Sequence, residues 1–264
     1  METNKNRSTF SGKVGFVLAA AGSAVGLGNL WRFPYLAAKY GGGIFLLVYI
    51  VLAVTFGFTL MVTEIAIGRK TRLSPMEAFG SLNKKWSWMG KLVTLVPVLI
   101  LPYYCVIGGW VTKYTATMIS GAVQDAAGDN YFSTFISGTG EPLLWFLLFM
   151  TATAVIVFLG VEKGIEKFSR VLMPALLILT ILLSIFVVTR PGAGAGVAYY
   201  LKPDFSKLSM MTVLAALGQL FFSMSLAMGI MITYGSYLRK QDHIEQSVRQ
   251  IEVFDTLVAF LAGL

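Results

Sequence analysis

Six long stretches of this sequence contain no charged side chain, and they constrain the fold more than any other feature. They cover residues 14–31, 40–63, 92–112, 143–161, 171–189 and 208–238. A helix needs about 20 apolar residues to cross the hydrocarbon core of a bilayer, and these runs approach or exceed that length. Six such runs would be difficult to bury together in a soluble protein, so the alternative of a large soluble core is disfavoured.

The sequence therefore predicts an all-α integral membrane protein with one transmembrane domain over residues 1–264. Only 13% of its 264 residues are charged, whereas soluble domains are about 25% charged. The last span is expected to be incomplete, because the sequence ends inside an apolar run, and we expect the chain to be part of a longer protein. The expected spans are roughly 14–36, 42–67, 90–120, 143–161, 167–190, 209–237 and 244–264.

The basic residues are distributed as in a membrane protein rather than a nucleic-acid-binding one. The net charge is +8, yet 15 of the 21 Lys and Arg residues fall in segments that are cytoplasmic if the N-terminus is inside. Cytoplasmic loops collect such residues. We expect a multi-pass protein of the cell inner membrane with a cytoplasmic N-terminus, a lipid bilayer around it and no nucleic-acid partner.

The residue types needed for enzymatic chemistry are scarce. The chain has a single cysteine, Cys105, and a single histidine, His243. No internal disulfide is possible, and neither a histidine-based nucleophilic triad nor a zinc cluster has support. The sequence therefore predicts neither an enzyme nor an organic cofactor.

The first span contains an unusual run from Gly22 to Pro34, with glycines at 22, 26 and 28. Glycine weakens a helix by about 1 kcal/mol relative to alanine, so a break is one interpretation. A break within a bilayer must be buried in protein or line a wet cavity, and its free backbone groups suit an anion and a cation. The alternative is close helix packing, because Gly22 and Gly26 have small-xxx-small spacing.

The sixth span has a second candidate break. Ser223 and Ser225 lie shortly before Gly229, in an uncharged run longer than one crossing requires. Paired interruptions in spans one and six are typical of an inverted five-helix repeat with a binding site at the midplane. The alternative is an ordinary long, tilted span whose serines bond to their own backbone.

Together these motifs resemble the sodium:neurotransmitter symporter family, in its bacterial amino-acid-transporting form. The similarity rests on four separated segments in the same order: Gly22–Pro34, Gly41–Gly43, Tyr103–Tyr104 and Gln219–Gly229. The resemblance implies sodium-coupled symport of an amino acid by alternating access, with broken helices 1 and 6 and truncation in helix 7. The alternatives are a truncated chain that does not transport and, less favoured, a membrane enzyme.

The resemblance also implies where co-transported sodium ions would bind. Gly22 and Val25 would provide backbone carbonyls to one site, whose other ligands come from a span outside this chain. A second site would use the Ala24 carbonyl with side chains of Asn29, Ser223 and Asp255. Because other members often have Asn at position 255, a carboxylate there could replace the charge of chloride, and we expect chloride-independent transport. The alternative is a charge near the membrane interface at Asp255.

The implied substrate pocket contains residues from spans one, three and six: Ala24, Gly26, Ile100, Tyr104, Phe222, Ser223, Ser225 and Met228. The Tyr104 hydroxyl would donate to the substrate carboxylate. Monoamine-transporting members have Asp at the position of Gly26, so glycine favours a substrate with its own carboxylate. Met228 favours a bulky hydrophobic or aromatic amino acid, whereas Ala227 departs from the usual glycine and leaves the extent of unwinding open.

The resemblance implies gates on both sides of this pocket. Arg32 and Gln219 would belong to the outer gate, with Tyr104 and Phe222 forming an aromatic lid. The inner gate would contain four residues: Arg7, Phe10, Ser236 and Tyr237. Gly164 and Pro174 match an inner-opening motif, because proline leaves the Arg170 carbonyl without its usual helical donor, although a simple proline kink remains the alternative.

Glu64 is the only acidic residue inside the first six expected spans. An ionisable group at such a position is a candidate functional residue. The alternative is a structural pair with a nearby loop base such as Arg69.

Overall fold

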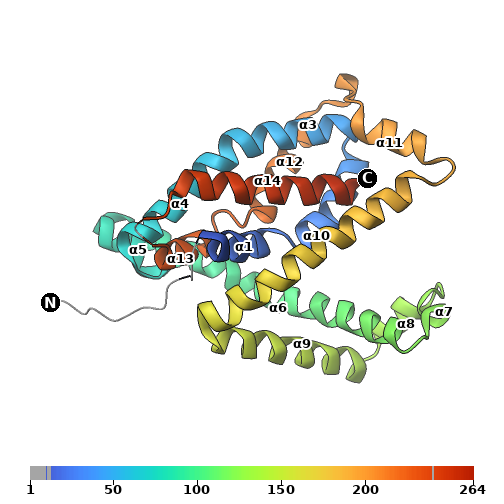
Figure 1. Ribbon diagram of the computed structural model, residues 1–264, viewed down its shortest axis with the longest axis horizontal. Helices are drawn as coiled ribbons and strands as arrows, with labels where there is room; N and C mark the ends of the chain where they lie inside the picture. The colour runs from blue at the N-terminus through green and yellow to red at the C-terminus, as the bar shows by residue number, and fades with distance from the viewer. Residues whose placement is uncertain (1–9, 11–12, 240) are drawn as a thin grey trace.

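The computed structural model describes residues 10, 13–239 and 241–264, and its regular structure is helical throughout these residues. The helices form one elongated bundle with a separate pair along one side (Figure 1). An all-helical fold was predicted from the uncharged runs and is confirmed. Their apolar side chains can be shielded only by other helices or by lipid, and a helix satisfies its own backbone groups.

The first run forms a bent unit. Helix α1 (Lys13–Ala24) is followed by a π-helical turn η1 (Gly28–Arg32) and helix α2 (Phe33–Lys39). The two halves are bent by 47°. The chain leaves regular helix at residues 25 and 26, next to the glycines that weaken it.

Four further segments are each long and apolar enough to cross a membrane: Gly43–Thr71, Lys84–Ile119, Gly140–Phe158 and Val161–Val188. The first contains α3 (Gly43–Leu52), π-turn η2 (Ala53–Gly57) and α4 (Phe58–Thr71). The short helix α5 (Pro75–Leu82) and turn η3 (Lys84–Trp86) lead into α6 (Ser87–Ile119). Then follow α9 (Gly140–Phe158), π-turn η4 (Val161–Glu166) and α10 (Lys167–Val188).

The remaining elements complete the ends and centre of the bundle. The short helices α7 (Val123–Ala126), α8 (Tyr131–Ser137) and α11 (Ala193–Leu201), with turn η5 (Phe205–Lys207), lie in connections. The sixth run is divided into α12 (Met210–Ser223) and α13 (Ile230–Tyr237), each too short to cross a bilayer alone. The last helix, α14 (Ile244–Gly263), carries four charged residues, so its apolarity is lower.

The bundle is organised around α14. This helix lies beside η2 and α4 on one side and α1 and α10 on the other (Figure 1). The buried face of α14 includes Asp255, whereas a charged residue of an ordinary interfacial helix would be exposed to water. Large side chains such as Phe16, Phe33 and Phe45 are fully buried in the surrounding core.

Helices α6 and α9 form the separate pair along one side (Figure 1). They approach closely at Gly108 and Gly109, where an added Cβ would collide with Phe149 and with the backbone of Phe146. Helix α9 has no buried residue, and apolar side chains such as Leu143, Leu147 and Val157 on its outer face are exposed. This surface matches a hydrocarbon environment.

Candidate functional site

A fully buried carboxylate joins four helical segments at the centre of the bundle. Oδ1 of Asp255 accepts hydrogen bonds from Nδ2 of Asn29 at 2.8 Å and from Oγ of Ser223 at 2.9 Å. Oδ2 accepts from the hydroxyl of Tyr49 at 2.9 Å. Asn29 and Asp255 are 0% exposed. Asp255 is therefore enclosed by helices rather than exposed to solvent.

These residues meet because each lies where its helix faces α14. Asn29 lies in the π-turn η1, Tyr49 in α3 and Ser223 at the end of α12. The Asn29 amide also donates to the backbone carbonyl of Asp255 at 3.0 Å, and its Oδ1 accepts from the Gly26 amide at 3.2 Å. We call Asn29, Tyr49, Ser223 and Asp255 the carboxylate node.

The node provides the chemistry of a hard-cation site. No Lys or Arg forms a salt bridge with Asp255 among the residues that the structure describes. A buried carboxylate is costly without a compensating positive charge or a proton. The carboxylate and hydroxyl oxygens of the node are ligands for hard cations, whereas Asn29 turns its Nδ2 group toward Asp255. Within the described ranges, no group of three or more His, Cys, Asp or Glu residues could hold a metal ion.

The interruption of the first span lies beside the node. An added Cβ at Gly22 would contact Ser169 and Met173 of α10, so this glycine does serve close packing. An added Cβ at Gly26 would meet no atom within 4 Å. The two glycines thus have different surroundings, and the space at Gly26 is not explained by helix packing. Ala24 and Val25, the other expected carbonyl donors, are buried at the same place.

The interruption of the sixth run faces that of the first. Residues 224–229 connect α12 to α13 without regular helix, and both Ser225 (φ 54°) and Ala227 (φ 57°) adopt left-handed backbone conformations. Oγ of Ser225 donates to the Ser23 carbonyl at 3.0 Å. This bond links the two interruptions directly, because it joins segments that are about 200 residues apart along the chain.

A cavity of about 240 Å³ lies between these interruptions and α6. Five predicted pocket residues line it: Ile100, Tyr104, Phe222, Ser225 and Met228. It is also lined by Ser23, Pro97, Leu101 and Ile230, which were not predicted. Its lining combines apolar side chains with three hydroxyl groups, as in a site for a small amphipathic molecule.

Three of the predicted pocket residues do not line this cavity. Ser223 directs its hydroxyl to Asp255 instead. Ala24 is buried, and Gly26 has no side chain with which to contribute. The Gly26 carbonyl accepts hydrogen bonds from the amides of Asn29 and Leu30, both at 3.1 Å. The structure thus places Ser223 with the node rather than with the cavity lining.

The predicted outer-gate residues lie together above the cavity. Arg32 donates to Oε1 of Gln219 at 3.1 Å, and its guanidinium is 5.1 Å from the centroid of the Phe222 ring. Gln219 in turn donates to the Gly28 carbonyl at 2.8 Å. The Tyr104 and Phe222 rings are 6.0 Å apart. The geometry connects the outer half of the first span to α12.

The structure describes three of the four inner-gate candidates: Phe10, Ser236 and Tyr237. The ring of Phe10, 1% exposed, packs edge-on against Tyr234 and Tyr237, with its centroid 6.0 and 6.4 Å from theirs. Ser236 is buried, and its carbonyl accepts from Arg72 at 2.9 Å. Arg7 lies outside the described residues.

The two residues of the expected inner-opening motif lie in continuous helical structure. Gly164 is in the π-turn η4, and Pro174 is inside α10. An added Cβ at Gly164 would collide with the Ile156 carbonyl of α9. In this structure Gly164 therefore permits a close approach of η4 to α9, and unwinding of the segment stays a prediction.

Two polar residues at the site were not among those predicted from the sequence. Tyr49 belongs to the carboxylate node, and Ser23 lines the cavity. The available signal was weak, since Tyr49 is simply a hydroxyl inside an apolar run. The expected alternative pairing of Glu64 with Arg69 is wrong. Arg69 donates to the Asp242 carbonyl at 2.7 Å, and Glu64 contacts Ala227.

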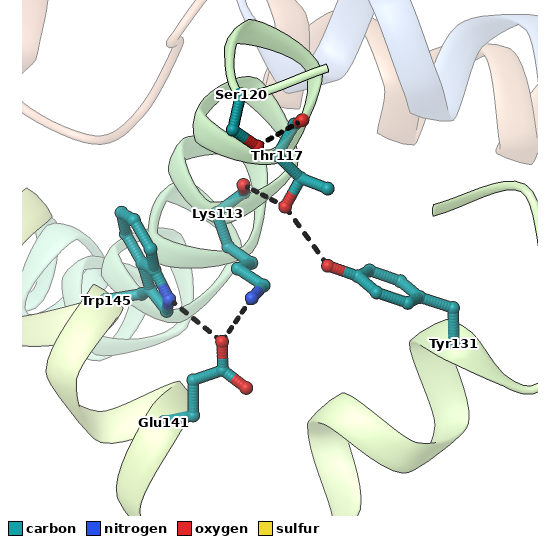
Figure 2. A network of polar contacts seen from close by, with 6 residues as sticks. All are labelled: Lys113, Thr117, Ser120, Tyr131, Glu141 and Trp145. Carbon is teal, nitrogen blue, oxygen red and sulfur yellow. Dashed lines mark hydrogen bonds and ion pairs between the residues drawn. The ribbon is translucent and has the colours of Figure 1, made fainter. Parts of the chain in front are cut away.

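A second polar cluster ties the connection between α6 and α9 to both helices (Figure 2). Lys113 of α6 forms an ion pair with Glu141 of α9 and lies within 6 Å of the aromatic rings of Tyr131, Phe135 and Trp145. The Tyr131 hydroxyl is 3.0 Å from Oγ1 of Thr117. The residues of the cluster, from Lys113 to Trp145, come from both helices and from the connection between them, so we expect their contacts to stabilise this connection.

Replacing Glu141 with glutamine should change stability only slightly. The Glu141 side chain is 50% exposed, and exposed ion pairs contribute about 0–1 kcal/mol. Lys113 should matter more, because its side chain also covers three aromatic rings. We expect a larger fall in melting temperature for Lys113→Ala than for Glu141→Gln, measured by thermal unfolding in detergent micelles. Equal losses would show that the ion pair alone accounts for the effect.

Comparison with known proteins gives a consistent result. Residues 7–135 and 130–264 match the model of the sodium:neurotransmitter symporter family. A Bacillus subtilis protein described as the uncharacterized sodium-dependent transporter YhdH is 38% identical over 260 residues. These cover 97% of this chain and 58% of that protein. The mouse sodium-dependent neutral amino acid transporter B(0)AT1 is 28% identical over 288 residues, covering 98% of this chain and 45% of that protein.

Among solved structures, the crystal structure of MhsT in complex with L-phenylalanine has a TM-score of 0.91 and 40% sequence identity. The match covers 98% of this chain and 60% of that one. The chain thus spans between 45% and 60% of the length of these relatives. The similarity extends over nearly all of the present residues.

Proposed function

The chain belongs to the sodium:neurotransmitter symporter family, and from this premise we propose that it forms part of a transporter that imports an amino acid together with sodium. The whole transporter would work by alternating access in the cell inner membrane, with the N-terminus in the cytoplasm. The relatives are transporters rather than enzymes, and they are sodium-dependent.

One observation carries the proposal: the cavity and the carboxylate node share the same two interruptions. Ser223 of the node and Ser225 of the cavity lie two residues apart in the segment where α12 ends. A cation beside Asp255 would therefore lie close to a molecule in the cavity. Binding of each would change the electrostatic environment of the other, which is the requirement for coupled transport.

The lining of the cavity supports a hydrophobic or aromatic amino acid as the substrate. Ile100, Phe222 and Met228 provide apolar surface, and Tyr104 and Ser225 provide hydroxyl groups. MhsT, whose fold this chain shares, binds L-phenylalanine in its crystal structure. Gly26 provides no side-chain carboxylate, so a substrate beside it would have to carry its own.

The driving force available to such a transporter is substantial. Each positive charge that moves inward down 100 mV releases about 2.3 kcal/mol. A tenfold sodium gradient contributes about 1.4 kcal/mol per ion. Two sodium ions, one at each expected site, would therefore support accumulation of an amino acid against its own gradient.

Radiolabelled uptake into proteoliposomes tests the proposal. The 264-residue chain and the longest product of its gene are reconstituted separately and offered tryptophan, phenylalanine, leucine and alanine, with and without an inward sodium gradient. We expect sodium-dependent accumulation, greatest for the bulky hydrophobic substrates. Uptake that is independent of sodium would contradict the coupling, and a preference for alanine would contradict the size assignment. Accumulation by the longer product alone would support a non-transporting role for the 264-residue chain by itself.

A further inference from the structure

A seam between the second span and α14 contains two cavities at its surface. Helices α4 and α14 lie side by side (Figure 1). The first, which we call the deep cavity, has a volume of about 310 Å³ and is lined by Val54, Phe58, Arg249, Glu252 and Val253. The second, the end cavity, has a volume of about 720 Å³ and is lined by Val62, Arg69 and residues 241–246.

The two cavities follow the same faces of both helices. Val54, Phe58 and Val62 are each four residues apart, as are Arg249 and Val253. Residues at this spacing lie on one face of a helix. Because Val62 lines the end cavity and the other four line the deep cavity, the two form one continuous seam that runs inward from the start of α14.

Apolar side chains form most of the wall of the deep cavity. Val54 is 61% exposed and Val253 is 65% exposed, and Phe58 lines the cavity with them. Lipid tails are as apolar as leucine side chains, so a tail can occupy such a groove without leaving a polar group unpaired. The deep cavity therefore matches an acyl chain.

Charges of both signs flank the seam near the start of α14. Glu245 and Arg249 are four residues apart, and both are exposed. Residues at this spacing can pair across one helical turn, yet neither forms a salt bridge within the part of the chain that the structure describes. The Arg249 guanidinium instead lies 5.8 Å from the centroid of the Phe58 ring. This cation–π contact keeps it at the seam, so both charges are available to a ligand there.

The position of Arg249 along α14 corresponds to the depth of lipid headgroups. The helix begins at Ile244, directly after the polar residues 241–243. Arg249 is five residues farther on, which is about 8 Å along the axis. Headgroup regions are roughly 5–8 Å thick on each side of the hydrocarbon core, and a charge below that level is costly without a partner. Arg249 is therefore placed to meet a lipid phosphate, with Glu245 farther from the hydrocarbon.

We propose that the seam is a binding site for phosphatidylethanolamine, whose phosphate pairs with Arg249 and whose ammonium pairs with Glu245. Guanidinium groups match the geometry of phosphate oxygens, and the ammonium of this lipid, like that of lysine, donates hydrogen bonds to a carboxylate. One acyl chain fills the deep cavity between Val54 and Val253. Glu252 also lines that cavity, which disfavours a lipid with net negative charge. The inference requires a membrane around the chain but not the transport activity proposed above.

Native mass spectrometry of the longest product of the gene, stripped of lipid and then titrated, measures the headgroup preference. Phosphatidylcholine has the same phosphate but a methylated ammonium without N–H groups, and phosphatidylglycerol has no cation. Phosphatidylethanolamine should bind at least about tenfold more tightly than either, because both of its charges form charge-assisted hydrogen bonds. Equal affinities for the three lipids would overturn the proposal.

Two charge variants separate the two halves of the headgroup. Arg249→Gln should weaken binding of phosphatidylethanolamine at least about tenfold, whereas Glu245→Gln should remove the preference over phosphatidylcholine. The matched control is Arg190→Gln. Arg190 is also exposed and lies over a phenylalanine ring, that of Phe186 at 3.8 Å, but it is outside both cavities. Equal losses of affinity in Arg249→Gln and Arg190→Gln would contradict a site at the seam.

Photolabelling locates the bound lipid. Phosphatidylethanolamine with a diazirine in one acyl chain is activated in nanodiscs that contain the same gene product, and labelled peptides are identified by mass spectrometry. Label should appear in residues 51–62 and 244–257, and most of it should be lost in Val253→Trp, which fills the deep cavity without changing either charge. Label that is absent from these peptides would overturn the proposal and indicate that another segment of the longer protein covers the seam. Label that persists in Val253→Trp would equally contradict an acyl chain in the deep cavity.

Discussion

Replacing Asp255 with alanine should lower sodium-dependent amino-acid uptake by at least about 100-fold, because each buried donor left without an acceptor costs about 1–3 kcal/mol. Asn29, Tyr49 and Ser223 all donate to this carboxylate. The substitution also removes the negative charge that would compensate a sodium ion. Uptake is measured in proteoliposomes over a range of sodium concentrations. A rate unchanged at every sodium concentration would contradict a role for the node in transport.

Two variants separate the charge of Asp255 from its hydrogen bonds. Asp255→Asn keeps the shape and one acceptor oxygen, so the protein should fold, but its half-saturating sodium concentration should rise at least about tenfold through loss of the charge. Glu252→Gln is the matched control. Glu252 is buried one turn earlier in α14 and is not among the residues that donate to Asp255, so this change should raise the half-saturating sodium concentration much less than Asp255→Asn does.

Comparison of the wild type with Asp255→Asn also tests chloride independence. In the wild type, uptake should be equal in chloride and gluconate media, because Asp255 already provides a fixed negative charge beside the cation. In Asp255→Asn this charge is missing, and uptake should be higher in chloride than in gluconate. A wild-type protein that requires chloride would show that the carboxylate does not replace the anion.

The helical fold could be predicted from the sequence because its signal, a run of about 20 uncharged and mostly apolar residues, extends over a whole span. The uncharged run before Thr112 is explained only by a helix that is surrounded by lipid or other helices, and it forms most of α6. Family membership could be predicted because several short motifs agree in order. Both the uncharged runs and the order of the motifs can be recognised without knowing which helices pack together.

The contacts of particular side chains could not be predicted in this way. Tyr49 and Glu64 lie on neighbouring parts of one span; Tyr49 is not marked by its local sequence, and the charge of Glu64 marks the residue but not its partner. Tyr49 gains its role only because its hydroxyl reaches Asp255 on α14, and Glu64 because α4 and α13 pack together. Likewise, the left-handed conformation of Ala227 opposes its own local preference. It follows from tertiary contacts, which a single sequence does not display.

Replacing Gly26 with aspartate should reduce amino-acid uptake by at least about tenfold, because two like charges in a poorly solvated site repel by more than 1.4 kcal/mol. Since an added Cβ at Gly26 meets no atom within 4 Å, the new side chain has room and the fold should persist. The measurement compares uptake of L-phenylalanine with binding of phenethylamine, which has the same ring and amine but no carboxylate.

The matched control is Gly26→Asn, which has nearly the size of aspartate but no charge. If the substrate carboxylate lies near Gly26, Gly26→Asp should weaken phenylalanine binding far more than Gly26→Asn does, and it should strengthen phenethylamine binding, since a carboxylate then attracts the amine. Equal losses of phenylalanine binding in both variants would mean that any larger side chain at position 26 interferes with binding, whatever its charge. The amino acid would then have to place its carboxylate elsewhere in the cavity, with the Tyr104 hydroxyl as the remaining donor beside Phe222.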